Sequence, residues 1–169
     1  MRSLPNIIIT GTPGVGKTTT ITELLNLAQS AEPPIPLKHL SINDIVKSRD
    51  FEKEISDGEG EGGFIIDWHS TAGFAVRWVD LVLVVRCAAT DVLYDRLSKR
   101  GYKEEKIQEN MDAEIFGVVL EEAKEGWEEE QVIELSSVNA EDVETNAERI
   151  LSWIKTWVLN QQHESKESG

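Results

Sequence analysis

The sequence predicts an α/β fold in which a parallel β-sheet is covered by helices on both faces. Short apolar segments alternate along the chain with longer segments that have the hydrophobic spacing of helices. The apolar segments lack polar alternation, as expected of strands that are buried on both sides. With 169 residues and no internal repeat, the chain is expected to form a single domain over residues 1–160. Residues 161–169 are polar and are predicted to form a disordered tail.

Each element follows from its own composition. The β-branched and apolar runs are predicted to be strands, and they occupy residues 6–10, 37–42, 64–67, 80–87 and 132–136. Segments with apolar residues three or four apart are predicted to be helices, and they occupy residues 19–31, 43–55, 91–100, 107–127 and 139–160. Proline ends the first helix, and glycine marks an acidic loop at 56–63 and a polar turn around Gly101.

Charge and cysteine content exclude several classes of function. The formal net charge is −14, so direct nucleic-acid binding is not expected and a polyanionic ligand would need a local cationic site. The acidic surface is suited to solubility or to a basic protein partner. No segment approaches the roughly 20 apolar residues of a membrane span. The single cysteine, Cys87, cannot form an internal disulfide and follows an apolar run, which favours inert burial over reactivity.

Residues 11–18, Gly-Thr-Pro-Gly-Val-Gly-Lys-Thr, match the phosphate-binding pattern G-x-x-x-x-G-K-[ST]. The match follows a predicted strand and precedes a predicted helix, which is the required context. Glycines let backbone N–H groups surround a phosphate at the positive end of the helix. Lys17 would contact the β- and γ-phosphates of ATP, and the Thr18 hydroxyl would bind Mg²⁺. The alternative is a tight turn that leaves an exposed lysine.

The stretch Gly63-Phe-Ile-Ile-Asp-Trp-His-Ser70 ends a buried strand in a carboxylate. In a parallel sheet the carboxyl ends of the strands face the ligand crevice, so Asp67 is a candidate to hold Mg²⁺ through its water. If the extended conformation continues, His69 lies on the same side and could orient a water or a substrate group. The alternatives are a solvated aspartate and an ordinary loop histidine. His39 lies in a predicted strand without an obvious partner.

Phosphoryl transfer also requires positive charge around the transferred group. Arg96 and Arg100 are four residues apart on one predicted helix, and Arg100 precedes the turn Gly101-Tyr102. This arrangement predicts a lid hinge that swings arginine onto phosphates, the alternative being a solvated basic face. A GTPase is disfavoured because the base-reading Asn-Lys-x-Asp tetrapeptide does not occur in the chain.

The stretches PNIIITGTPGVGKTT, IIDWH, LVLVVRC, LYDRLSKRGY, DAEIFGVVLEEA and ILSWIKTWV together resemble the adenylate kinase isoenzyme 6 family. The resemblance covers nearly the whole chain. It implies an adenylate-kinase-like, three-layer P-loop fold with a five-stranded parallel sheet and a small lid. It also implies Mg²⁺-dependent transfer from ATP to AMP, an ATPase activity, and a role in 18S rRNA and small ribosomal subunit maturation. A basic small-subunit ribosomal protein is the implied partner, and nucleus and cytoplasm are the implied locations.

The resemblance also assigns residues. It places the lid at about 99–109, with Arg100 as its arginine, and the nucleotide-monophosphate region at about 37–62. It gives His69 a part in ATP hydrolysis beside Asp67. ATP is expected on Gly14, Gly16, Lys17, Thr18, Thr19 and Arg100, the metal on Thr18 and Asp67, and catalysis on Lys17, Asp67, His69 and Arg100.

Two departures concern the acceptor side. The family carries a longer acidic and apolar stretch before the Asp-x-His strand, and this chain is shorter there by about one helix with its loop. Its Phe-Pro-Glu-Arg after the histidine becomes Phe-Ala-Val-Arg at 74–77, and Lys47 stands where a basic residue is expected. Two other functions therefore stay open: an ATP-dependent assembly factor that phosphorylates nothing, and a kinase of another small metabolite.

Overall fold

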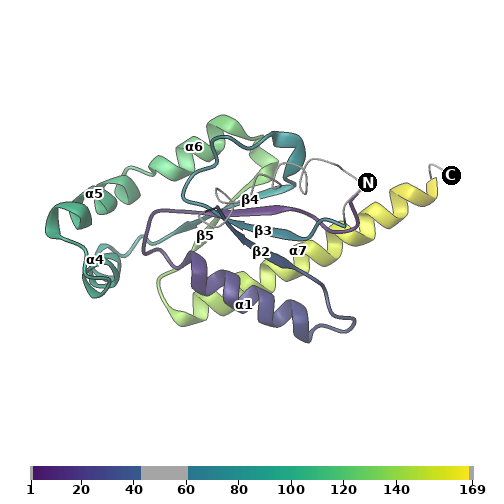
Figure 1. Ribbon diagram of the computed structural model, residues 1–169, viewed down its shortest axis with the longest axis horizontal. Coiled ribbons are helices and arrows are strands. Elements are labelled where there is room, and N and C mark those ends of the chain that lie inside the picture. The colour runs from purple at the N-terminus through teal and green to yellow at the C-terminus, as the bar shows by residue number, and fades with distance from the viewer. Residues whose placement is uncertain (1, 43–60, 168–169) are drawn as a thin grey trace.

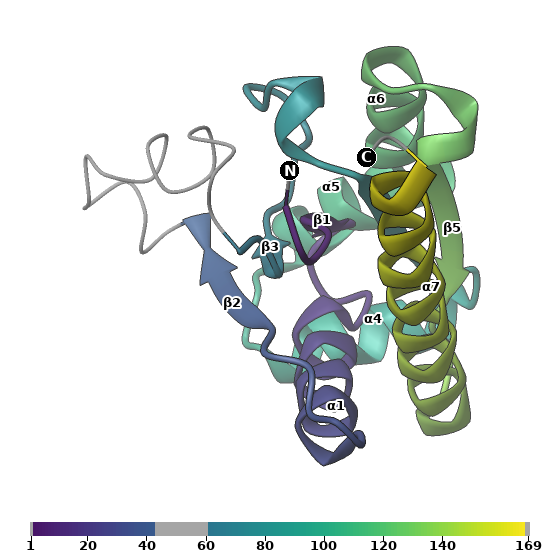
Figure 2. The same ribbon diagram turned by 90° about the vertical axis from the view of Figure 1, so that its right-hand side faces the viewer.

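The computed structural model describes residues 2–42 and 61–167. Within them a five-stranded sheet runs in the order β2-β3-β1-β4-β5, and every neighbouring pair is parallel (Figures 1 and 2). This confirms the predicted sheet. The strands are β1 (Ile7–Thr10), β2 (Lys38–Ser41), β3 (Phe64–Asp67), β4 (Leu81–Arg86) and β5 (Val132–Ser136).

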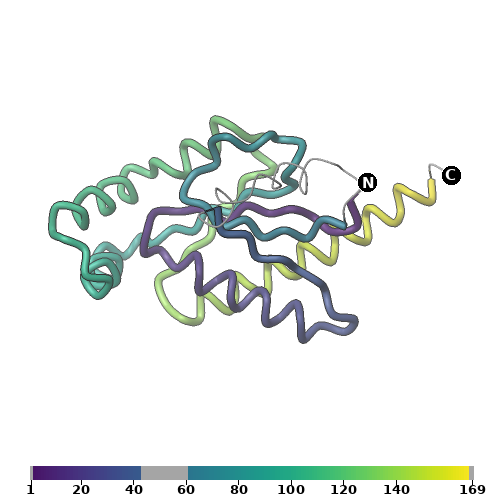
Figure 3. Tube along the Cα trace, in the orientation of Figure 1, coloured from purple at the N-terminus to yellow at the C-terminus, as the bar shows by residue number. Residues whose placement is uncertain are grey.

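Helices cover both faces of the sheet (Figure 1). The first and last helices pack against each other on one face, a third covers the opposite face, and two more lie beyond the carboxyl ends of the strands (Figure 3). The helices are α1 (Lys17–Ser30), α4 (Thr90–Lys99), α5 (Glu104–Ile115), α6 (Val118–Gly126) and α7 (Ala140–Glu167), with short 3₁₀ turns η1 (Val76–Trp78) and η2 (Glu129–Gln131).

A hydrophobic core lies on each face of the sheet, and alternate residues of the same strands fill the two cores. Ile7 and Ile9 point toward α1 and α7, whereas Ile8 between them points toward α6. All three side chains are fully buried. Successive side chains of a strand face opposite sides of the sheet, which is why an unbroken apolar run is needed where both faces are covered.

The predicted helix over 107–127 is in fact two helices. α5 ends at Ile115, and Gly117, with φ at +66°, precedes α6. Glycine adopts this left-handed conformation without steric cost, so the chain turns there. As a result Ile115 and Phe116 are exposed at the corner between the helices.

Two further expectations concern the ends of elements. The predicted disordered tail of residues 161–169 is wrong over most of its length, because α7 continues to Glu167. Its Gln, Glu and Lys residues favour helix even without apolar contacts. The predicted helix over 43–55, Lys47 and most of the region 37–62 lie outside the described residues. No helix in the described part of the chain is long and apolar enough to cross a bilayer.

The environment of Cys87 generates a prediction. The thiol lies directly after β4, is 1% exposed, and burial raises its pKa. Because the thiolate is the reactive form, a thiol reagent at neutral pH should modify Cys87 on the order of 100-fold more slowly in native protein than in urea. Ellman's reagent measures both rates on this one cysteine. Rapid modification of Cys87 in every native molecule would contradict the burial of its thiol.

Candidate functional site

The phosphate-binding loop connects β1 to α1 at the carboxyl end of the sheet, as predicted. Two glycines allow its course. A Cβ on Gly11 would lie 2.6 Å from the Val85 carbonyl oxygen, and a Cβ on Gly16 would lie 2.7 Å from the Ser137 hydroxyl. Gly16 also has φ at +104°, which side-chain-bearing residues rarely adopt. The loop can therefore lie this close to β4 and to the segment after β5 only with glycine at these positions.

Lys17 is the first residue of α1 and is partly buried under the loop. Its Nζ donates a hydrogen bond to the Gly11 carbonyl oxygen at 2.5 Å. Burial is the main effect on the pKa of Lys17 and lowers it, while the Asp67 carboxylate opposes the change. Arg100 lowers the pKa further. The predicted residues Lys17, Asp67 and Arg100 are thus close enough to interact electrostatically.

Thr18 and Thr19 lie in the first turn of α1 and are exposed at the same helix end. Backbone N–H groups at such an end lack intrahelical partners and carry a partial positive charge. A phosphate group that approaches this end would therefore meet donors from the backbone and from both threonine side chains.

Asp67 ends β3 beside the start of the loop, because Asp67 pairs with Ile9 of β1. Its side chain is 19% exposed, and its Oδ2 lies 3.6 Å from Nε2 of His39 on the adjacent strand β2. Sequence reasoning found no partner for His39, because the contact depends on which strands are neighbours in space. Asp67 thus lies at the carboxyl end of its strand, and its binding of Mg²⁺ stays a prediction.

His69 does not follow Asp67 in an extended conformation, since β3 ends at Asp67. The imidazole is exposed, and its ring centroid lies 4.0 Å from that of Trp68 with the rings tilted by 42°. His69 makes no hydrogen bond or ion pair to another described residue. Its expected place beside Asp67 therefore stays a prediction.

The loop after His69 is held by a carboxylate on α6. Glu122 Oε1 accepts hydrogen bonds from the Ser70 hydroxyl at 2.7 Å and from the Thr71 backbone N–H at 2.6 Å. Burial opposes ionisation of Glu122, but these bonds outweigh it and hold the pKa of Glu122 below its ordinary value. Sequence reasoning did not find this anchor, because α6 and the loop meet only in the folded chain.

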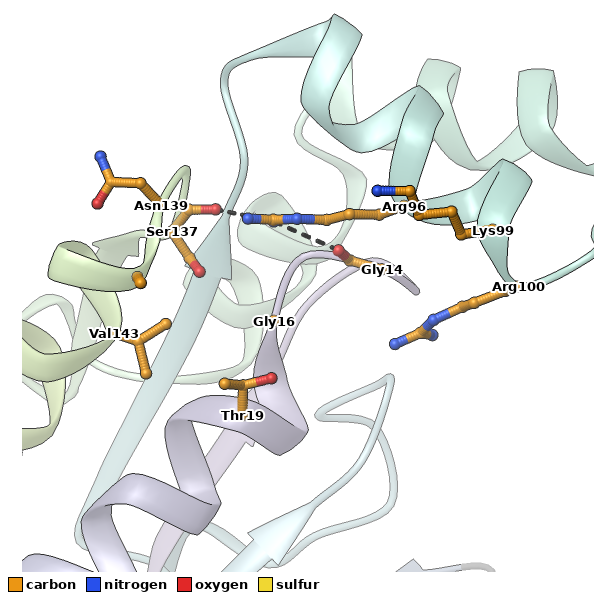
Figure 4. Close-up of a pocket in the computed structure, with 10 residues that line it drawn as sticks. Gly14, Gly16, Thr19, Arg96, Lys99, Arg100, Ser137, Asn139 and Val143 are labelled. Carbon is orange, nitrogen blue, oxygen red and sulfur yellow. Dashed lines mark hydrogen bonds between the residues drawn. The ribbon is translucent and has the colours of Figure 1, made fainter.

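Arg96 has a different role from the one predicted. Its guanidinium donates to the Ser137 and Val138 carbonyl oxygens at 3.0 Å each, and more weakly to Gly14 and Val15 at 3.5 and 3.4 Å. Figure 4 shows Arg96 extended between the phosphate-binding loop and the end of β5. The lid hinge was predicted from the spacing of Arg96 and Arg100, but Arg96 joins α4 to two other segments, so only Arg100 stays a candidate for that movement. An arginine satisfies several carbonyls at once because its donors form a planar fork.

Arg100 caps the end of α4 and is exposed. The following Gly101 has φ at +78°, which confirms the predicted turn. The predicted lid residues 99–109 form this turn and the first half of α5; their movement stays a prediction. In Figure 4 the Arg100 side chain extends from the end of α4 toward the start of α1, where Thr19 lies.

A hollow with a volume of about 370 Å³ adjoins the phosphate-binding loop (Figure 4). Its far wall comes from the segment after β5, which sequence reasoning did not assign to the site. In that wall the Ser137 hydroxyl is fully buried and has no hydrogen-bond partner within the described residues. The lining residues are Gly14, Gly16, Thr19, Arg96, Lys99, Arg100, Ser137, Asn139, Ala140 and Val143.

A divalent cation fits this site. The described residues contain no cluster of three or more acidic, histidine or cysteine side chains that could hold a metal alone. Mg²⁺ with a nucleotide needs no such cluster, because waters and phosphate oxygens fill most of its positions. Thr18 and Asp67 would supply the hydroxyl and the carboxylate, and both lie at the carboxyl edge of the sheet.

The chain is similar over most of its length to proteins named adenylate kinase isoenzyme 6 homolog. The Schizosaccharomyces pombe protein is 40% identical over 177 aligned positions, covering 94% of this chain and 97% of that protein. The Saccharomyces cerevisiae homolog FAP7 is 38% identical, covering 94% and 85%. The Caenorhabditis elegans homolog is 39% identical, covering 88% of each. Residues 48–117 match the AAA domain family.

Solved structures share the fold at low sequence identity. A shikimate kinase from Bacteroides thetaiotaomicron is 14% identical with a TM-score of 0.55, covering 90% of this chain and 99% of that one. A sugar kinase from Janibacter is 16% identical with a TM-score of 0.56, covering 92% and 98%. These likenesses concern architecture, and they confirm the predicted three-layer α/β P-loop fold.

Ser137→Ala tests whether the hollow binds nucleotide through the unpartnered hydroxyl. A ligand that supplies the missing partner would lose one hydrogen bond, so Mg²⁺–ATP binding should weaken by roughly fivefold to tenfold. The free protein should be as stable as the wild type or more stable, because an unpaired buried hydroxyl is removed. Calorimetric titration and thermal unfolding measure the two effects.

The control for Ser137→Ala is Ser136→Ala, which alters the exposed neighbouring hydroxyl. It should change neither ATP affinity nor stability. Unchanged ATP affinity in Ser137→Ala would show that the hydroxyl does not contact the nucleotide.

Glu122→Gln tests the anchor of the loop that carries His69. A carboxylate whose pKa is depressed by folding adds stability above its unfolded pKa and loses it as the pH falls through the folded pKa. The variant should therefore lose about 1 kcal/mol of unfolding free energy at pH 7. The difference from wild type should shrink as the pH falls below the ordinary range of a glutamate pKa and through the lower pKa of folded Glu122.

Urea unfolding across this pH range measures this difference, with Glu125→Gln on the exposed face of α6 as the matched control. A deficit that stays the same from pH 7 down to the lowest pH at which both proteins fold would contradict the role of the charge.

Proposed function

The chain belongs to the adenylate kinase isoenzyme 6 family, and from this premise we propose that it transfers the γ-phosphoryl group of ATP to AMP and also hydrolyses ATP. The observation that carries the proposal is the cationic pocket at the start of α1. There Lys17 lies beneath a phosphate-binding loop, within electrostatic range of Asp67 and Arg100. A kinase-like, nucleotide-binding function agrees with the relatives' names and with the shared fold.

The phosphates of ATP would occupy the end of α1. Backbone N–H groups of Gly14 and Gly16 and the Thr19 side chain would surround the α- and β-phosphates, and Lys17 would contact the β- and γ-phosphates. The nucleoside would extend into the adjoining hollow, whose rim carries Arg100 and whose wall carries Ser137. Lys17 and Arg100 would then stabilise the negative charge that spreads over the transferred group.

Thr18 and Asp67 are the residues that would hold Mg²⁺, the hydroxyl directly and the carboxylate through water. When bound, the ion supplies neutralisation of phosphate charge and fixes the orientation of the phosphates. Asp67 is suited to this task because it is largely buried and ends a strand beside the loop. His39, 3.6 Å from the same carboxylate, would help to orient it.

His69 would orient the group that attacks the γ-phosphate. Its ring is exposed on a loop that Glu122 anchors through Ser70 and Thr71. A rotation of the loop backbone or side chain would be needed to bring the imidazole beside Asp67. Such closure on binding substrate is common among kinases of this architecture.

The shortened acceptor region favours a second candidate function, that of an ATP-dependent assembly factor that transfers phosphate to no acceptor molecule. The 177 aligned positions exceed the whole chain of 169 residues, so the alignment leaves gaps opposite residues of the S. pombe relative. A chain shortened on the acceptor side could retain ATP hydrolysis and lose AMP binding. The net charge of −14 would favour a basic small-subunit ribosomal protein as partner, in nucleus and cytoplasm, during 18S rRNA maturation.

One assay separates the two activities. Phosphoryl transfer to AMP yields two ADP per ATP and no free phosphate, whereas hydrolysis yields one ADP and one phosphate. We expect ADP formation from Mg²⁺–ATP to rise severalfold with AMP, without a matching rise in free phosphate. Coupled assays of ADP and phosphate measure both products.

If phosphate is released at the same rate with and without AMP, the proposed kinase activity is contradicted and only the ATPase activity remains. Turnover of neither kind would contradict both. Omission of Mg²⁺ with excess EDTA is the control, and it should abolish the reaction because free ATP lacks charge neutralisation.

A further inference from the structure

A buried carboxylate lies behind the phosphate-binding loop, outside the set of residues used above. Glu114 belongs to the last turn of α5 and is 4% exposed. A charge in this position is costly unless it is paired and fully hydrogen-bonded. Both of its carboxylate oxygens have partners, and they come from different parts of the sheet edge.

One oxygen of Glu114 fixes α5 to β4. Oε1 accepts hydrogen bonds from Nε of Arg86 at 2.6 Å and from the Cys87 backbone N–H at 3.0 Å. The Arg86 guanidinium also donates from Nη2 to the Glu114 carbonyl oxygen at 2.7 Å. Removing Arg86 would leave the buried Glu114 carboxylate without a countercharge, so this half of the network stabilises the fold.

The second oxygen reaches the phosphate-binding loop. Glu114 Oε2 accepts a hydrogen bond from the Thr12 hydroxyl at 2.7 Å, and Thr12 is 2% exposed. The Thr12 carbonyl oxygen in turn accepts from the Val15 backbone N–H at 3.3 Å across the loop. Thr12 is therefore held through its side chain by α5 while its backbone closes the turn.

We propose that Glu114 is a positioning residue for phosphate binding, which acts through Thr12 and does not itself contact the nucleotide. With Thr12 held, the loop keeps its open shape and its remaining N–H groups stay directed toward the phosphate. A preorganised loop loses less conformational freedom on binding, so the ligand binds more tightly. The inference rests on the proposed function, in which this loop binds the phosphates of ATP.

The two carboxylate oxygens of Glu114 separate its positioning of the loop from its support of the fold. The bonds to Arg86 and Cys87 use Oε1, and the bond to Thr12 uses Oε2. Glu114→Gln would disturb both halves and leave Arg86 with only the exposed Glu134, at 3.7 Å, as a countercharge, so the variant could fail to fold. Thr12→Val removes only the bond to the loop, with a side chain of nearly the same shape.

The test compares Thr12→Val with Thr12→Ser by calorimetric titration with Mg²⁺–ATP, well below the melting temperature of each. Thr12→Val should bind ATP about tenfold more weakly, the loss expected for one hydrogen bond to a charged group. Thr12→Ser keeps the hydroxyl and should bind within about twofold of wild type. Glu134→Gln is the matched control, because Glu134 is an exposed neighbour of Arg86 at 3.7 Å that does not touch the loop.

Wild-type affinity in a folded Thr12→Val variant would overturn the proposal. So would an equal loss of affinity in Thr12→Ser, because the hydroxyl would then not be the cause. Absence of ATP binding by the wild type is a different result, which would overturn the proposed function itself.

Discussion

A chain with a formal net charge of −14 has to attract a ligand that is itself a polyanion. The repulsion is overcome locally, where the N-terminus of α1, Lys17 and Arg100 gather positive charge at one edge of the sheet. A carboxylate beside this edge must be neutralised or assigned to the metal. Glu114 is paired with Arg86, and Asp67 is the carboxylate proposed to hold Mg²⁺. The position of each charge near the loop follows from this constraint.

The consecutive helices α5 and α6 connect the two loops on which the proposed chemistry depends. Glu114 near the end of α5 holds Thr12 in the phosphate-binding loop, and Glu122 on α6 holds Ser70 and Thr71 in the loop after His69. Between these anchors the chain turns at Gly117 and exposes Ile115 and Phe116. The loops are therefore positioned by a helical element that is remote from both in sequence.

Sequence patterns predicted the parts of the molecule whose physics is local. The strands were recognisable because burial on both faces requires unbroken apolar runs. The loop of residues 11–18 was recognisable because its spacing of glycines and lysine is typical of phosphate binding. Contacts between distant segments could not be predicted in this way. Arg96 looked like a mobile cation on a helix face, yet it bonds to carbonyls of two distant segments. The partners of His39 and Glu114 likewise depend on which strands and helices are neighbours in space.

Equilibrium binding of Mg²⁺–ATP to wild type and Lys17→Ala most directly tests the central claim that the cationic edge of the sheet is a nucleotide site. Calorimetric titration should give one ATP per wild-type chain. Affinity should fall by at least about 100-fold in Lys17→Ala, because a largely desolvated cation–phosphate contact is lost. A folded Lys17→Ala variant that binds ATP as tightly as wild type would contradict the claim, as would a wild-type chain that binds no ATP.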